Sequence, residues 1–371
     1  MAVQSRAKRL FGYGFQLQRK IREYLVGEKS QFASLRQEFY RKLWLETAGQ
    51  LNVPIEELEK GIYRVFVNDR QIFVMGGFVP LDDFLILKIA GNKPLSLQLL
   101  SELGVPVPRH VVFDYFSRKK AEIFLKNINK PIVIKPADSG SAGGGVFTGI
   151  TSPAQLKQAA REASAHSQRL LAEEQIPGNS YRLLYLDGEF IDAIRRDPPA
   201  ITGNGKYSIK RLIGEENQLR LKEGDRAMHP ISIDRELKQF LKERGLSITN
   251  IPETNQKIVL KRVVNQNNRF QNHSVREMVH PTTIEMGQKI VRSLGIRLAG
   301  IDLQSTDISL PLDESRGVVN EINTTPGLHH HYLIAEKDKI IPVAKLILER
   351  LIKLSEKQSR EYLNESEQFK T

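Results

Sequence analysis

A glycine-rich segment between two β-like runs limits most strongly what this chain can fold into. In the stretch IVIKPADSGSAGGGVFTGI, residues 132–150, Lys135 lies near the end of the first run. The loop that follows contains four closely spaced glycines: Gly140, Gly143, Gly144 and Gly145. Glycine lets backbone N–H groups approach a ligand closely, so the stretch predicts a strand, a loop that could surround an anion, and a returning strand. The P-loop pattern GxxxxGK[ST] and the dinucleotide pattern GxGxxG are absent. Taken alone, the stretch is more typical of a mobile hairpin turn.

The absence of cysteine narrows the chemistry. With no cysteine in 371 residues, the chain cannot form disulfides, use a thiolate nucleophile or hold Cys-ligated zinc, so oxygen or histidine must bind any metal ion. Its 40% hydrophobic and 26% charged content is that of an ordinary globular protein with room for two or three subdomains. No apolar run approaches the roughly 20 residues that span a bilayer, and no signal-peptide core is visible. We therefore expect a cytoplasmic protein without a membrane partner.

The net charge of +12 is concentrated near the start of the chain. Residues 1–42 contain ten Lys or Arg and three Asp or Glu, interleaved with aromatic residues. This pattern is typical of an amphipathic helical region with a solvated basic face. A nucleic-acid-binding or membrane-surface patch would have a similar composition, and a basic surface could also attract anionic substrates.

Short β-like runs alternate with helical stretches along the chain. Helical sequence extends to about Glu59, and residues 62–77 indicate two strands around an Asn-Asp turn. Further helices are expected within residues 90–104, 117–128, 152–166 and 208–245. Further strands are expected at residues 131–136, 146–150, 169–177, 181–186, 189–195, 257–264, 297–305 and 316–323. This alternation indicates an α/β or α+β domain, and no internal repeat is visible.

Three oxygen-bearing side chains are expected on two neighbouring strands. Asp302 lies in LAGIDLQ (298–304), and Glu321 and Asn323 lie in GVVNEINTTPG (317–327). Residues two apart on a strand face the same side, so Glu321 and Asn323 should point together. Carboxylate and amide oxygens are ligands that Mg²⁺ prefers, and carboxylates between apolar flanks need a partner. The residues alone leave two other interpretations open, namely polar groups of an edge strand, or a turn that begins at Asn323.

Four segments together resemble the ATP-grasp carboxylate-amine ligases, most closely the ATP-grasp module of cyanophycin synthetases. They are GNKPLSLQLLSELGVPVP, PIVIKPADSGSAGGGV, EEQIPGNSYRLLYLDGEFIDAIRRDPPAITGNGKYSIKRLI and GIRLAGIDLQSTDISLPLDESRGVVNEINTTPGL, and they occur in that family's order and spacing. The similarity spans roughly residues 62–350. It implies an α+β (α/β) chain with the ATP-grasp fold, in which two α/β subdomains grip ATP between them.

The resemblance implies a division of the chain into four parts. Residues 1–88 would form a basic helical N-terminal region with a β-hairpin, and residues 89–178 the central or lid subdomain with the glycine-rich loop. Residues 179–353 would form the C-terminal subdomain with the metal and substrate site, and residues 354–371 a polar tail.

The resemblance also assigns roles to residues of this sequence. It implies that ATP binds with two Mg²⁺ ions, for which Mn²⁺ is an alternative. The implied metal ligands are Asp302, Glu321 and Asn323. The implied nucleotide-binding residues are Lys93, Lys135, Ser139, Gly140, Ser141, Gly143, Gly144, Gly145, Glu173, Glu174 and Ile176. The implied basic residues near the reacting centre are Arg182, Arg195, Arg196 and Lys261.

Some of these residues have a simpler interpretation. Lys93 could be an exposed lysine at a helix start, and Arg195 and Arg196 could serve only a surface turn. Adjacent residues on a strand face opposite sides, so only one of these two arginines should reach the site. In LHHHY (328–332) we expect a substrate-facing His331 rather than a metal site.

The sequence also departs from the family pattern. Asn92 replaces the usual Asp, Ser180 occupies a place where an acidic residue often holds the ribose, and the glycine loop is one residue longer. Lys261 stands where cyanophycin-type enzymes carry an arginine, and residues 263–281 replace their Ser/Gly-rich stretch beside the acceptor. The substrate is therefore expected to differ from the cyanophycin chain. A Mur-ligase-like half is not present in the sequence, so we do not expect this chain alone to complete a polymerisation cycle.

The leading hypothesis is an ATP-dependent ligase that joins a small or peptide acid to an amine through an acyl phosphate, releasing ADP and phosphate. Two alternatives remain, namely a nucleic-acid- or protein-binding factor with a vestigial ATP site, and an ATP-grasp kinase. Among partners we expect acid and amine substrates and a homo-oligomer of undetermined size, and we regard nucleic acid as the less favoured partner.

Overall fold

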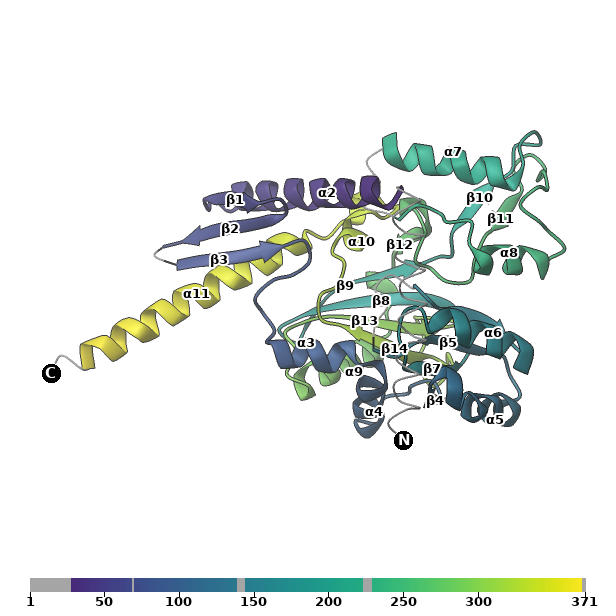
Figure 1. Ribbon diagram of the computed structural model, residues 1–371. Helices are drawn as coiled ribbons and strands as arrows, with labels where there is room; N and C mark the ends of the chain where they lie inside the picture. Colours follow the sequence, from purple (N-terminus) through teal and green to yellow (C-terminus); the bar gives the residue numbers. More distant parts are fainter. Residues whose placement is uncertain (1–27, 69, 139–143, 223–228, 369–371) are drawn as a thin grey trace, which may run out of the picture.

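The computed structural model describes residues 28–68, 70–138, 144–222 and 229–368 (Figure 1). Every strand pair in these ranges is antiparallel, and helices cover the sheets, so the predicted α+β class is confirmed. No helix in these ranges is both long enough and apolar enough to cross a bilayer.

The N-terminal unit combines a long helix with a three-stranded sheet. Helix α2 (Glu28–Gln50) packs on the sheet β1–β2–β3, and α11 (Val343–Gln368) from the far end of the chain joins the same core. The strands are β1 (Ile55–Glu59), β2 (Ile62–Val67) and β3 (Arg70–Met75). Trp44 is fully buried in this core.

Strand β1 corrects the prediction that helical sequence continues to Glu59. The helix ends at Gln50 because Asn52 takes a left-handed backbone conformation (φ +53°), and Pro54 cannot continue a helix. The two predicted strands within residues 62–77 are confirmed as β2 and β3.

A four-stranded sheet of order β4–β7–β5–β6 carries the glycine-rich segment. Its strands are β4 (His110–Phe113), β5 (Ile132–Pro136), β6 (Phe147–Ile150) and β7 (Leu170–Glu174). Helices α5 (Lys119–Ile128) and α6 (Pro153–Ala163) pack on it, and every residue of β5 is buried. The predicted strand and returning strand are therefore present as β5 and β6, and residues 139–143 between them lie outside the described residues.

A five-stranded sheet of order β12–β9–β8–β13–β14 forms the opposite side. Its strands are β8 (Asn179–Leu186), β9 (Glu189–Arg196), β12 (Asn272–Ser274), β13 (Leu298–Ser305) and β14 (Val318–Asn323). Helix α9 (Pro281–Ser293) packs on this sheet, while α3 (Phe84–Gly91) and α4 (Lys93–Glu102) contact β14. No pattern in the sequence predicts α3, α9 or β12.

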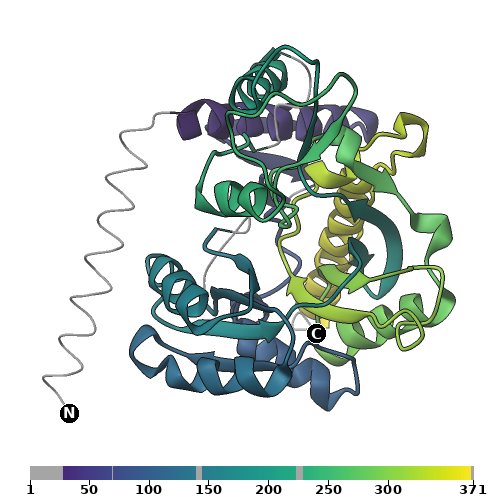
Figure 2. The ribbon, with the colours of Figure 1, turned by 90° about the vertical axis from the view of Figure 1, so that its right-hand side faces the viewer.

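A smaller unit completes the fold. It contains β10 (Ala200–Thr202), α7 (Ile209–Lys222), α8 (Arg235–Lys242) and β11 (Lys257–Val259), around its own apolar core. Figures 1 and 2 show α7 close to the beginning of α2. The short helix α10 (His329–Tyr332) lies under α2, and Tyr40 of α2 contacts His329. Short 3-10 helices lie at Tyr115–Ser117, Arg269–Gln271, Arg276–Met278 and Lys337–Lys339.

Candidate active site

A cleft of about 3070 Å³ is lined by residues of all these units. Small-molecule sites are usually about 300–1,000 Å³, so this cleft has room for a nucleotide and further substrates together. Among the described residues, fourteen Lys or Arg and eight Asp or Glu line it. The excess of positive charge favours anionic ligands.

Lys135 and Glu173 form a buried ion pair on the first wall of the cleft. Lys135 lies on β5 and Glu173 on the neighbouring β7, with 2.7 Å between Nζ and Oε2 and both side chains 8% exposed. Glu174 also lines the cleft but pairs with Arg109 and Lys130, at 2.9 and 2.7 Å. The hydrogen bond from Arg109 is the main cause that lowers the pKa of Glu174. Ile176 lines the cleft just beyond β7.

Lys93 joins helix α4 to the opposite wall. Its Nζ lies 2.6 Å from Oε1 of Glu321 on β14, and the two side chains are 10% and 29% exposed. Asn92 caps α4 through its side-chain oxygen, which accepts a hydrogen bond from the backbone N–H of Leu95. The interpretation of Lys93 as an exposed helix-start lysine is therefore wrong.

Arg182 and Asp302 form a two-point ion pair between β8 and β13. Arg182 Nε lies 2.6 Å from Asp302 Oδ1, and its terminal nitrogen lies 2.7 Å from Oδ2. Burial alone would raise the pKa of Asp302, but the charges of Arg182 and Arg196 and the hydrogen bonds from Arg182 and Asn323 lower it below its usual value. Asp302 is therefore a carboxylate at neutral pH.

Arg196 shares this carboxylate only at a distance. Its terminal nitrogen lies 3.7 Å from Asp302 Oδ2, another donates to the carbonyl of Val264 at 3.3 Å, and its buried Nε has no partner in the described ranges. Burial and the charge of Arg182 lower the pKa of Arg196 to about 10. Arg196 is thus a buried cation without a carboxylate of its own.

Arg195 faces the other side of strand β9. It pairs with Asp197 at 2.9 Å and is not among the residues that line the cleft in the described part of the chain. Successive side chains alternate between the faces of a strand, which explains why Arg196 reaches the cleft and Arg195 does not. This placement corrects the inclusion of Arg195 among residues near the reacting centre.

Asp302, Glu321 and Asn323 converge as the sequence predicts. Asp302 lies directly opposite Glu321 across β13 and β14, and Asn323 lies opposite Gly300. Opposed like charges destabilise a sheet unless they are compensated, and here Arg182 and Lys93 supply the opposite charge. Within the described ranges no group of three or more His, Cys, Asp or Glu could hold a metal ion. The candidate metal ligands are thus two carboxylates and one amide, a hard oxygen set that suits Mg²⁺.

The glycine loop contributes to the cleft at its end. Gly144 and Gly145 line the cleft, whereas Ser139, Gly140, Ser141 and Gly143 lie outside the described residues. Gly145 has φ +77°, and a Cβ there would lie 2.8 Å from the ring of His166. A side chain is therefore excluded at Gly145 by both conformation and space.

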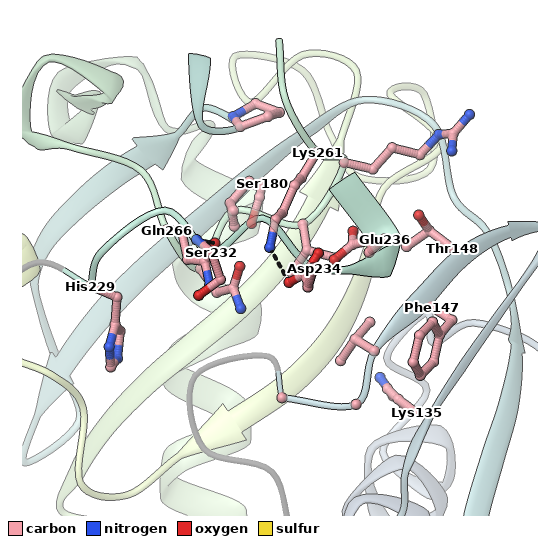
Figure 3. Close-up of a pocket in the computed structure, with 18 of the residues that line it drawn as sticks. Lys135, Phe147, Thr148, Ser180, His229, Ser232, Asp234, Glu236, Lys261 and Gln266 are labelled. Carbon is pink, nitrogen blue, oxygen red and sulfur yellow. Dashed lines mark hydrogen bonds and ion pairs between the residues drawn. The ribbon is translucent and has the colours of Figure 1, made fainter. Parts of the chain in front are cut away.

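Lys261 lies on the wall formed by the small helical unit. It is 1% exposed and pairs with Asp234, the N-cap residue of α8. Figure 3 shows this pair with Glu236 beside it, and Lys135 and Phe147 on the facing side. Burial raises the pKa of Glu236 to about 7. No motif in the sequence identifies Asp234 or Glu236 as residues of this wall.

The three consecutive histidines have different surroundings. His331 is fully buried, and its Nδ1 lies 2.7 Å from Asp192 Oδ2, so the prediction of a substrate-facing His331 is wrong. His329 and His330 line the cleft instead. A short helix turns these side chains in different directions, and a sequence pattern cannot show which one faces the cleft.

The N-terminal region also contributes to the cleft. Arg36, Gln37 and Tyr40 of α2 line it, and the Tyr40 hydroxyl lies 3.1 Å from Nδ1 of His329. The part of the basic region before residue 28 lies outside the described residues. No motif in the sequence indicates that α2 belongs to the site.

Comparisons with known proteins agree with this geometry. No protein-family model matches the chain. It is 31% identical over 247 residues to the cyanophycin synthetase of Trichormus variabilis, an alignment that covers 66% of this chain and 27% of that protein. It is 27% identical over 253 residues to the glutathione biosynthesis bifunctional protein GshAB of Clostridium perfringens, covering 67% and 32% of the two proteins.

A solved structure is similar as well. The bifunctional glutathione synthetase from Pasteurella multocida aligns with a TM-score of 0.50 and 23% identity, over 76% of this chain and 39% of that one. The chain spans 27% to 32% of the length of the two curated relatives named above. These similarities confirm the predicted fold and relationship: the chain has the ATP-grasp fold and is related to the ATP-grasp module of the cyanophycin synthetases.

Proposed function

We propose that the protein is an ATP-dependent carboxylate-amine ligase that works through an acyl phosphate. The observation that carries this proposal is a set of three cation–carboxylate pairs in one cleft. They are Lys93–Glu321, Lys135–Glu173 and Arg182–Asp302, with contacts of 2.6, 2.7 and 2.6 Å.

These pairs suggest how the cleft accepts a nucleotide. Charges as buried as these need counterions, and removing one partner alone is costly. Phosphate oxygens can replace Glu321 and Glu173 as partners of Lys93 and Lys135. Asp302, Glu321 and Asn323 would then hold Mg²⁺, which when bound neutralises charge on the β- and γ-phosphates. The lysines would then exchange carboxylate partners for phosphate, and the freed oxygen ligands would bind the metal ion. The ligand-free cleft is therefore preorganised to bind an anion and a cation together.

The remaining steps follow from the groups on the cleft walls. A carboxylate oxygen of the acid attacks the γ-phosphorus, and the bond to the oxygen of ADP breaks. The amine nitrogen then attacks the acyl carbon, phosphate leaves, and the amine loses a proton. Arg182 and Arg196 would stabilise the charge of the transferring phosphoryl group. No side chain has to act as a nucleophile, which agrees with a chain without cysteine.

The glycine-rich loop would cover the phosphates during these steps. Gly144 and Gly145 line the cleft, and the absence of side chains would let backbone N–H groups approach the phosphates. A closed loop would keep water from the acyl phosphate.

The relatives support this class of reaction, and the structure suggests a different substrate. These relatives are named for cyanophycin and glutathione synthesis. In this chain, the segment 263–281 contributes Val263, Val264, Asn265 and Gln266 to the lining of the cleft. We propose that the acid or the amine differs from those of the relatives.

The test is to incubate the protein with ATP, Mg²⁺, and pooled acids and amines. We expect ADP and phosphate to form only when both an acid and an amine are present. AMP and pyrophosphate as products would rule out this mechanism. A stable phosphorylated acid formed without an amine would instead indicate the kinase, and salt-sensitive nucleic-acid binding without turnover would indicate the binding factor.

A further inference from the structure

The wall formed by α2 and α10 is not explained by nucleotide or metal binding. Arg36 and Tyr40 of α2 and His329 and His330 of α10 line the same cleft. Figure 2 shows α2 across the top of the molecule and the sheet that carries Lys135 at the lower left. A nucleotide held near Lys135 and Glu173 would therefore leave this wall for another ligand.

Packing fixes the position of α2 on this wall. The Tyr40 hydroxyl is 3.1 Å from His329 Nδ1, and the rings of Phe39 and Tyr40 both meet the His329 ring edge-on, with centroids 6.4 and 6.0 Å apart. Tyr40 is 6% exposed and belongs to the main core of the N-terminal unit. Arg36 is one helical turn before Tyr40, so the same packing positions Arg36 along the cleft.

The wall is electropositive. Burial together with the charges of Arg36, Arg182 and Arg196 lowers the pKa of His329 well below its usual value. The two carboxylates on the adjoining strands are already paired, Asp302 with Arg182 and Glu321 with Lys93.

Two buried nitrogen atoms on this side of the cleft indicate a binding site for a ligand. Arg196 is 8% exposed and its Nε has no hydrogen-bond partner, and His330 Nδ1 also has none in the described ranges. A buried charged donor that lacks an acceptor is costly, so an arriving anion would gain more here than at the protein surface.

We propose that Arg36, Arg196 and His330 bind a second carboxylate of the acid substrate, so that the site selects dicarboxylic acids. This inference rests on the proposed ligase function. The carboxylate to be activated would lie near the metal ligands, and the second carboxylate would lie against α2 and α10. Helix α2 thus supplies substrate specificity to the ATP-grasp site.

The test is a binding measurement with matched probes. Dicarboxylates from malonate to adipate, and the mono-amide of each, are titrated into the full chain with Mg²⁺ and a non-hydrolysable ATP analogue. For the best-fitting length, we expect the dicarboxylate to bind about ten- to a hundredfold more tightly than its mono-amide, because one charge-assisted contact is lost in the amide.

Substitutions test which side chain causes the preference for the dicarboxylate over its mono-amide. In R36Q, the affinities for the dicarboxylate and for its mono-amide should become similar. R36K should keep part of the difference between these affinities, because lysine keeps the positive charge. R41Q is the matched control, since Arg41 lies on the same helix and pairs with Glu57 at the surface. The inference is overturned if the wild-type protein shows no preference for any dicarboxylate, or if R36Q keeps that preference.

A parallel turnover assay separates the two proposals. If the wild-type protein releases ADP with acids and amines but does not prefer dicarboxylates, the ligase proposal stands and the second-carboxylate site falls. If R36Q loses a clear preference while no acid and amine pair supports ADP release, the anion site stands and the ligase proposal falls.

Discussion

Replacing Glu321 by glutamine separates the charge-compensating role of this residue from its proposed role at the metal. In the ligand-free protein Glu321 is the partner of Lys93, with 2.6 Å between the charged atoms and side-chain exposures of 29% and 10%. Removing one member of a fully buried pair costs about 3–5 kcal/mol, and water can reach this pair from the cleft, so we expect a loss of about 1–3 kcal/mol. For a chain of this size that loss corresponds to a fall in Tm of a few degrees.

The same substitution should change the response to ligands in a specific way. ATP without Mg²⁺ should raise the Tm of E321Q more than that of the wild-type protein, because Lys93 no longer has a carboxylate that competes with phosphate. The further rise on adding Mg²⁺ should be largely lost in E321Q. The rate of ADP formation should fall on the order of 10²–10³-fold, the usual effect of losing a group that stabilises transition-state charge.

The assays are thermal unfolding with and without each ligand, and steady-state ADP release. E189Q serves as the control, because the Glu189 side chain is 71% exposed and lies 3.8 Å from Arg350. If E321Q keeps the wild-type rate and the full effect of Mg²⁺ on Tm, the role assigned to Glu321 is refuted.

Three further predictions follow from the cleft. Lys135→Met should weaken ATP binding by about tenfold or more, measured by calorimetry, because a charge-assisted contact is removed; unchanged affinity would contradict the phosphate-binding role. R196Q should lower kcat on the order of 10²-fold, whereas R195Q should stay near the wild-type value, and equal effects in steady-state kinetics would contradict the opposite facing of the two side chains. The pKa of Glu236 is raised to about 7 by burial, so the folded state binds more protons and its stability falls as the pH rises from the unfolded pKa toward about 7. In denaturant unfolding, the free energy of unfolding of E236Q should therefore exceed that of the wild-type protein by about 1–3 kcal/mol at about pH 8, but by little at about pH 4. An equal difference at both pH values would contradict this prediction.

The central residues of the site could be predicted because their signals are local. Lys135 lies near the end of a strand that precedes a glycine-rich loop, and the two-residue spacing of Glu321 and Asn323 places them on one side of a strand whatever the rest of the fold is. Family order and spacing then linked these segments. The structure brings Lys93, Lys135, Asp302 and Glu321 into one cleft, as expected.

The parts of the site that the sequence does not predict depend on tertiary contacts. Arg36 and Tyr40 belong to a helix whose sequence shows only a basic amphipathic pattern, and their position at the site follows from packing against α10, which is 289 positions away at the Tyr40–His329 contact. His331 differs from His330 only in the direction of its side chain, which the buried Asp192 decides. Ion pairs such as Lys261–Asp234 join residues that no spacing rule relates.

The most direct test of the proposed mechanism follows oxygen rather than product. An acid that supports ADP release is labelled with ¹⁸O in its carboxylate and incubated with ATP, Mg²⁺ and the amine, and the released phosphate is analysed by mass spectrometry or ³¹P NMR. Attack of the carboxylate on the γ-phosphorus predicts one ¹⁸O atom in each phosphate, because the acyl carbon gives up one of its oxygens when the amine attacks. Unlabelled phosphate, or label found in AMP, would contradict the acyl-phosphate mechanism.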